Sequence, residues 1–263
     1  MTVVTNDGML ALAERLGVQT LPLVLGVGPR QDTVAEWAAA QRTATAALVA
    51  DGAIDGYGEV APDLADALYV LAQPDRELVA RIVSEQGTVR LCLALRAERH
   101  ALAVRTGDRF DVRTTWSDGS GSSLAAPVLA ALGPASPADV ASVSAPAADL
   151  GDRLAAARGS TDFADAFYAL GLPDRDATRY GMAFASCHAY AEVVVCAHAD
   201  GVTTRPPGAV AVYDTGRGRI VAAPGVSPDR ELWSTVTPGT DHRVAQAIAG
   251  LIETLPGGRW LPQ

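Results

Sequence analysis

Lysine is missing from this sequence: all 21 basic residues among its 263 positions are arginine. Without lysine the chain has no Schiff-base nucleophile and no P-loop lysine for nucleotide phosphates, which excludes those classes of enzyme. The same composition, rich in alanine, arginine and glycine, is typical of a genome with a high G+C content. The absence of lysine therefore excludes some classes of enzyme but does not indicate a function.

Cysteine is also scarce, because Cys92, Cys187 and Cys196 are the only three and none forms a Cys-x-x-Cys motif. An odd and sparse set of cysteines predicts reduced thiols rather than a disulfide framework. No apolar run reaches the length of about 18 residues that a membrane helix needs. Residues 1–8 also lack a basic segment followed by an apolar run, so we expect neither a signal peptide nor membrane insertion. Together these features predict a cytoplasmic protein.

Charge of one sign predominates, with a formal net charge of −9. An acidic surface repels phosphate backbones, so we expect no nucleic-acid partner. Hydrophobic residues make up 49% of the chain and charged residues only 19%, which excludes wholesale disorder and is enough for a sizeable core.

An internal repeat is the most informative feature. Residues 63–77 read DLADALYVLAQPDRE and residues 162–176 read DFADAFYALGLPDRD, identical at nine of fifteen positions with an offset of 162 − 63 = 99. Apolar residues recur at helical spacing in both copies. We expect Asp63 and Asp162 to be N-caps, and Pro74 and Pro173 to end one helix and begin another. Each copy thus predicts two helices with a tight break between them.

Short β-prone runs follow both copies, and the brief breaks between them predict antiparallel meanders. The expected strands are 88–96, 100–106 and 109–116 in the first half, and 188–199, 209–214, 219–223 and 232–237 in the second. Further helices are expected at 7–16, 32–49, 122–132 and 240–255, and residues 134–146 look like the connection between halves. The pattern predicts an α/β (α+β), pseudo-twofold fold with a central, mainly antiparallel sheet flanked by helices. We expect residues 1–263 to be a single domain made of two pseudo-repeats, about 1–133 and 146–263.

Candidate catalytic or metal-binding residues are few. Cys187, His188, Cys196 and His198 are zinc-ligand types. On one strand, however, the ends of this segment lie about 33 Å apart at about 3.3 Å per residue, so the four cannot reach one ion. We expect no metal, no cofactor and no catalytic residue. One alternative is a small enzyme or ligand-binding α/β protein that uses Cys196 and His198, which predicts bound zinc or a thiol of lowered pKa. Another is a homo-oligomer joined through an open sheet edge.

The C-terminal stretch from Ala209 onward carries a family resemblance. Its signature is a strand pair, a Trp strand and a Thr-Pro-Gly-Thr-Asp turn that opens the last helix: Asp214, Thr215, Gly218, Arg219, Ile220, Trp233, Thr237, Pro238, Gly239, Thr240 and Asp241, continued by Leu255, Pro256 and Trp260. This arrangement resembles the EspG family of actinobacterial type VII (ESX) secretion chaperones. Residues 11–17 and 21–25 are similar to that family's first helix and strand, so the resemblance covers nearly the whole chain.

The resemblance implies a fold and a function. EspG proteins are pseudo-twofold molecules with a central antiparallel sheet and two helical bundles. They are cytosolic chaperones that bind the tip of the PPE subunit of a PE–PPE heterodimer, keep the pair soluble and direct it to an ESX system. The family's binding mode implies contacts from the sheet, the loop after the second strand and the C-terminal bundle: here Ala97, Glu98, Arg99, His100, Phe163, Phe167, Val244, Ile248 and Leu251. We expect a non-enzymatic protein that is a monomer or weak homodimer when free.

Overall fold

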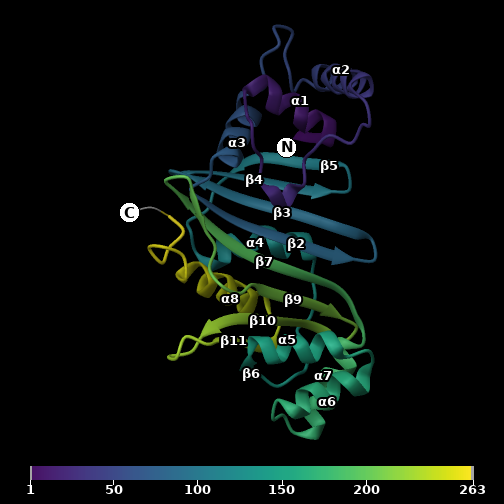
Figure 1. Cartoon of the computed structure of the whole chain (residues 1–263), viewed down its shortest axis with the longest axis vertical. Helices are drawn as coiled ribbons and strands as arrows, with labels where there is room; N and C mark the ends of the chain where they lie inside the picture. Colours follow the sequence, from purple (N-terminus) through teal and green to yellow (C-terminus); the bar gives the residue numbers. More distant parts are fainter. Residues whose placement is uncertain (1, 262–263) are drawn as a thin grey trace.

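The computed structural model describes residues 2–261, which form one eleven-stranded antiparallel sheet with helices on both faces (Figure 1). The strands are β1 (Thr2–Thr5), β2 (Arg76–Ser84), β3 (Gly87–Arg96), β4 (Arg99–Thr106), β5 (Arg109–Thr115), β6 (Val143–Pro146), β7 (Cys187–Ala199), β8 (Val202–Thr204), β9 (Val210–Thr215), β10 (Gly218–Val226) and β11 (Leu232–Pro238). The helices are α1 (Asn6–Leu16), α2 (Val34–Ala50), α3 (Pro62–Ala72), α4 (Gly121–Leu132), α5 (Ala147–Ala156), α6 (Ser160–Ala169), α7 (Asp174–Phe184) and α8 (Asp241–Glu253), with a 3-10 helix η1 (Leu23–Leu25).

The order of the strands is mirrored about the central pair β2–β7. It runs β1-β5-β4-β3-β2-β7-β9-β10-β11-β6, with β8 paired to β7 outside this path. In each half an edge strand leads directly into a helix (β1 into α1, β6 into α5), and a helix follows the last strand of each meander (α4, α8). The predicted fold class, a pseudo-twofold α/β molecule with an antiparallel central sheet flanked by two helical bundles, is confirmed.

Three apolar clusters hold the layers together. One cluster packs α4 and α8 against the central strands on one face and draws residues from both halves, such as Leu78 and Ile248. The second packs α1, α2 and α3 on the opposite face over β3, β4 and β5. The third packs α5, α6 and α7 on that same face over β9, β10 and β11. Because the first core needs side chains from both halves, we propose that the chain is a single domain.

The prediction of a helix after Pro74 is wrong, because residues 76–84 form strand β2. The two copies of the repeat are alike only as far as the turn. Beyond it, Leu78, Ala80 and Ile82 are buried with a period of two, and β2 pairs with β3 on one side and β7 on the other. After Pro173 the buried residues recur at helical spacing, and the predicted helix α7 forms.

Three smaller expectations also fail. The N-cap of α3 is Ala61, with a proline at the first helical position, and that of α6 is Gly159. Asp162 instead lies in the first turn of α6, where its carboxylate accepts the Arg158 N–H at 2.8 Å. Residues 21–25, expected as a strand, contain η1, which ends at Gly26 in the left-handed region (φ 58°). The connection at 134–146 ends in strand β6, which the sequence analysis did not predict.

The Thr-Pro-Gly-Thr-Asp turn surrounds one buried arginine. Arg219 is 1% exposed, and its guanidinium donates to both carboxylate oxygens of Asp214 at 2.6 and 2.9 Å and to the Gly133 carbonyl at 2.9 Å. The amide of Gly239 donates to the Arg219 carbonyl at 2.7 Å, and a Cβ at position 239 would lie 2.7 Å from that carbonyl carbon. Thr240 then caps α8 by accepting the Arg243 N–H at 3.1 Å. The motif is therefore a structural joint between β10, β11 and α8.

Candidate functional site

The middle of the sheet is left uncovered on one face. In Figure 1, β2 and β7 cross the molecule between the group α1–α3 and the group α5–α7. Since neighbouring residues of a strand point to opposite faces, every second side chain of these two strands faces this opening. We call these residues the central strip: Glu77, Val79, Arg81 and Val83 from β2, and Tyr190, Glu192, Val194, Cys196 and His198 from β7.

The central strip alternates apolar and charged residues along its length. Val79 lies directly opposite Val194 across the strands, and both are half-buried. Arg81 lies opposite Glu192, an arrangement in which unlike charges on neighbouring strands attract. Tyr190 is 40% exposed, which is a larger exposed fraction than a tyrosine in the core has. Half-buried apolar side chains next to charged ones are typical of protein-binding faces.

One end of the central strip deepens into a pocket of about 470 Å³. Its floor is Glu77, Val79, Val194, Cys196 and His198, one wall is the segment around η1, and Thr203 and Arg205 lie on the opposite side. We call this hollow the Glu77 pocket. It is formed by the pairing of the two central strands, so residues from both halves of the chain line it.

Glu77 is the charged group of this pocket. The His198 Nε2 lies 3.2 Å from a Glu77 carboxylate oxygen, and the His198 Nδ1 lies 3.0 Å from the Thr203 hydroxyl. Burial raises the pKa of Glu77 above its ordinary value, and the nearby imidazole opposes that shift. The pocket thus holds an acid in a mostly apolar environment.

The cysteines are unsuited to nucleophilic chemistry. Burial raises the pKa of Cys187 and Cys196 above the ordinary value and that of Cys92 well above it. The thiolate is the reactive form, so a raised pKa means a less reactive thiol. The enzyme alternative predicted a thiol of lowered pKa, and the structure shows the reverse. Among residues 2–261, no three His, Cys, Asp or Glu side chains are grouped as a metal ion would require.

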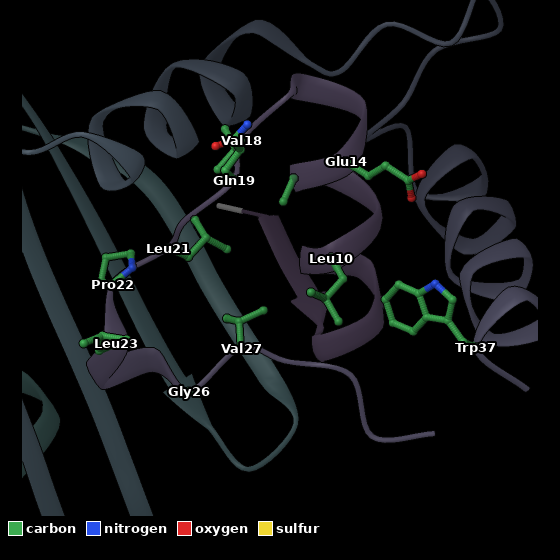
Figure 2. A pocket seen from close by; sticks show the side chains of 11 residues that line it. Leu10, Glu14, Val18, Gln19, Leu21, Pro22, Leu23, Gly26, Val27 and Trp37 are labelled. Carbon is green, nitrogen blue, oxygen red and sulfur yellow. The ribbon is translucent and has the colours of Figure 1, made fainter. Parts of the chain in front are cut away.

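A second hollow of about 480 Å³ adjoins the first on the α1–α2 side. Figure 2 shows Leu10 of α1 beside the indole of Trp37 from α2, with Leu21 and Val27 of the following segment facing the same space. Leu21, Pro22 and Leu23 line both hollows, so this segment is a ridge between them. Leu23 on the ridge is 96% exposed. An exposed leucine between two hollows is placed to enter a partner's surface.

The predicted loop contacts lie at the end of the central strip. Ala97, Glu98 and Arg99 are exposed, and the Ala97 N–H donates at 2.6 Å to Asp75, beside the start of β2. His100 is only 3% exposed: it accepts the Trp260 indole N–H at 3.0 Å, and burial lowers its pKa. The first three therefore remain proposed contacts, whereas His100 holds the C-terminal segment against the sheet.

The predicted helix contacts are mostly in the core. Phe167, Val244 and Ile248 have no exposed surface, and Leu251 is 1% exposed. The α8 residues pack against the sheet on the face opposite the central strip, so the structure does not bring them to the loop. Phe163 is half-buried and stacks on Phe184 with 5.6 Å between ring centroids. Only Phe163 of this group remains a proposed contact.

Sequence reasoning singled out Cys196 and His198 but missed the β2 half of the central strip and Leu23. The signal for the strip was present in β2, where Glu77, Val79 and Arg81 alternate with buried residues, but that segment was interpreted as a helix. No signal marked Leu23, since an apolar residue in a Leu-Pro-Leu-Val-Leu run is typical of a buried strand.

Known protein families and relatives were compared with the sequence of this chain. The family model of the EspG family matches residues 5–250. The chain belongs to the EspG family. It is 32% identical to the ESX-1 secretion-associated protein EspG1 of Mycobacterium tuberculosis, a match that covers 98% of this chain and 88% of the relative. It is 28% identical to the ESX-3 secretion-associated protein EspG3 of Mycolicibacterium smegmatis, with 98% and 88% covered.

A solved structure shares the fold of this EspG-family chain. It is the Mycobacterium tuberculosis type VII secretion system chaperone EspG5 in complex with the PE25–PPE41 dimer. The two match with a TM-score of 0.79 over 98% of each chain at 20% sequence identity, so the likeness concerns the fold. Within residues 2–261 of the present chain, none of the helices has the length and hydropathy that a membrane crossing requires.

Proposed function

We propose that this EspG-family chain is a cytoplasmic chaperone of type VII secretion that binds the PPE subunit of a PE–PPE heterodimer and carries out no catalysis. The partner class is supported by the fold shared with a chaperone solved in complex with a PE–PPE dimer. The secretion role is supported by the names of the EspG1 and EspG3 relatives. The raised pKa values of its three cysteines favour binding over chemistry.

The observation that carries the binding site is the uncovered central strip. It lies between the two helix groups, and Arg81, Tyr190 and Glu192 in it are exposed. Val79 and Val194 are half-buried in the structure of the free chain. A partner surface that packs on the strip would remove these apolar side chains from water. The Leu23 ridge, the loop Ala97–Arg99 and Phe163 border the same face and complete the proposed interface. Capping an apolar tip there would shield it from water and from self-association.

The test is co-expression with PE–PPE pairs of the same genome, followed by size-exclusion chromatography with light scattering. A 1:1:1 complex, with a pair more soluble than when expressed alone, is the expected result. Leu23→Asp is expected to weaken binding at least tenfold, since a buried interface leucine replaced by a charge loses both apolar contact and desolvation. Its matched control is Val34→Asp, which changes another exposed apolar residue (83% exposed) outside both hollows. Failure of the wild-type chain to bind any pair of that genome would overturn the proposal.

A further inference from the structure

The Glu77 pocket has apolar walls and one carboxylate in its floor. Leu21, Pro22 and Leu23 form the wall towards α1, and Val79 and Val194 lie beside the acid in the floor. With a volume of about 470 Å³, the pocket is larger than any single side chain, so one long side chain and part of its backbone fit inside. A bound side chain would therefore contact apolar side chains along most of its length and the Glu77 carboxylate at one point.

The ion-pair partner of this acid is a histidine, and no arginine of the described structure is paired with it. The His198 Nδ1 lies at hydrogen-bond distance from the Thr203 hydroxyl, and the Nε2 lies 3.2 Å from Glu77. His198 is therefore the residue paired with Glu77 across the two strands. Arg205 lines the pocket with an exposed side chain, and no ion pair joins it to Glu77 in the described structure. The Glu77 carboxylate thus lines the pocket without an arginine partner from the described chain.

Such an acid is unfavourable for the folded chain alone. Desolvation disfavours its charged form, as the raised pKa of Glu77 indicates. A carboxylate held in an apolar pocket at a cost in stability is a mark of a binding or catalytic site. Elsewhere on the central strip the charges are arranged differently, because Arg81 lies opposite Glu192. Glu77 is therefore the strip's acid that has no arginine opposite it, because Cys196 lies there.

We infer that the Glu77 pocket receives an arginine or lysine side chain of the PPE subunit, with its aliphatic stem against the Leu21–Leu23 wall and its charged head on the Glu77 carboxylate. This inference rests on the proposed function and names one anchor of that interface. The apolar stem and cationic head of these side chains match the two parts of the pocket. A charge-assisted hydrogen bond inside a desolvated pocket is stronger than one at the rim. The net charge of −9 also favours approach of a basic feature.

The experiment measures the affinity of the full-length chain for a PE–PPE pair that forms a complex with the wild type. Glu77→Gln is expected to weaken binding at least tenfold while its melting temperature is not lower than that of the wild type. The matched control is Glu85→Gln, an exposed acid beyond the other end of β2, which is expected to change affinity less than twofold. Arg205→Gln is expected to bind about two- to threefold more tightly, because it removes a like charge from beside the incoming cation.

A reciprocal series identifies the partner residue. Each arginine and lysine of the PPE subunit's tip is replaced by glutamine, and one of these changes is expected to weaken binding as much as Glu77→Gln. Combined with Glu77→Gln, that change is expected to cost little more than either alone. Equal affinity of the wild type and Glu77→Gln would overturn the pocket assignment alone. Weaker binding by Arg205→Gln would indicate an anion in the pocket and overturn it too. If the wild type binds no PE–PPE pair, both the proposed function and the pocket assignment are overturned.

Discussion

The buried pair of Arg219 and Asp214 allows the most quantitative prediction. Arg219→Met keeps the length and apolar stem of the side chain but removes its charge. Asp214, 7% exposed, then loses both guanidinium hydrogen bonds and is left as an unpaired buried carboxylate. Removing one partner of a buried ion pair costs about 3–5 kcal/mol. The Gly133 carbonyl loses its donor as well, which adds about 1 kcal/mol.

The assay is urea unfolding followed by circular dichroism, with scanning calorimetry as a second measurement. At about 2–4 °C per kcal/mol for a chain of this size, the melting temperature is expected to fall by roughly 8–24 °C. Arg217→Met, two residues away and exposed, is the matched control and is expected to change stability by less than about 0.5 kcal/mol. The double variant Asp214→Leu with Arg219→Met should recover much of the loss, because no charge is then left unpaired. A loss below about 1 kcal/mol in Arg219→Met would refute the reasoning.

Three further predictions concern stability and reactivity. Gly239→Ala is expected to cost about 1–3 kcal/mol in urea unfolding, since its Cβ would lie 2.7 Å from the Arg219 carbonyl carbon; an unchanged midpoint would contradict the close approach. Because the folded-state pKa of Glu77 is raised, the folded chain binds that proton more tightly than the unfolded chain does, so this group's contribution to stability falls as pH rises from the ordinary carboxyl range through the raised pKa. Melting curves across pH should show that Glu77→Gln gains on the wild type over this window, and a constant difference would refute it. Cys196 should react with iodoacetamide at pH 7 more slowly than a free cysteine model peptide, since its pKa is raised by burial; a faster reaction would revive the enzyme alternative.

Local patterns of the sequence predicted most of the elements. The seven predicted strands are present with ends within three residues, because their period-two alternation and their turn residues are local properties. The apolar residues that recur at helical spacing in 240–255 predicted α8, and Thr240 caps that helix. The Thr-Pro-Gly-Thr-Asp motif indicated the family for the same reason, since the turn, the glycine next to Arg219 and the cap all lie within five consecutive residues.

The tertiary structure decided which secondary structure follows each copy of the repeat. The stretch Pro-Asp-Arg occurs in both halves, yet it leads into strand β2 in one and helix α7 in the other. Residues 76–84 have a place between β3 and β7 in which every backbone group can find a ladder partner, and burial of alternate side chains favours the strand there. This choice created the central pair of the sheet, and with it the central strip.

The candidate site was determined by pairing between distant segments. Glu77 and His198 come from opposite halves of the chain, and they meet because β2 and β7 pair in one register, with Glu77 opposite Cys196. A shift of β2 by one residue against β7 would turn Glu77 towards α4 and α8 and away from His198. The burial of Phe167, Val244, Ile248 and Leu251 was decided in the same way, since periodicity identifies an apolar face but not whether the chain or a partner covers it. The sequence by itself thus determined the elements, the family and the acidic, lysine-free composition, whereas side-chain packing across the two halves decided which residues remain free to bind.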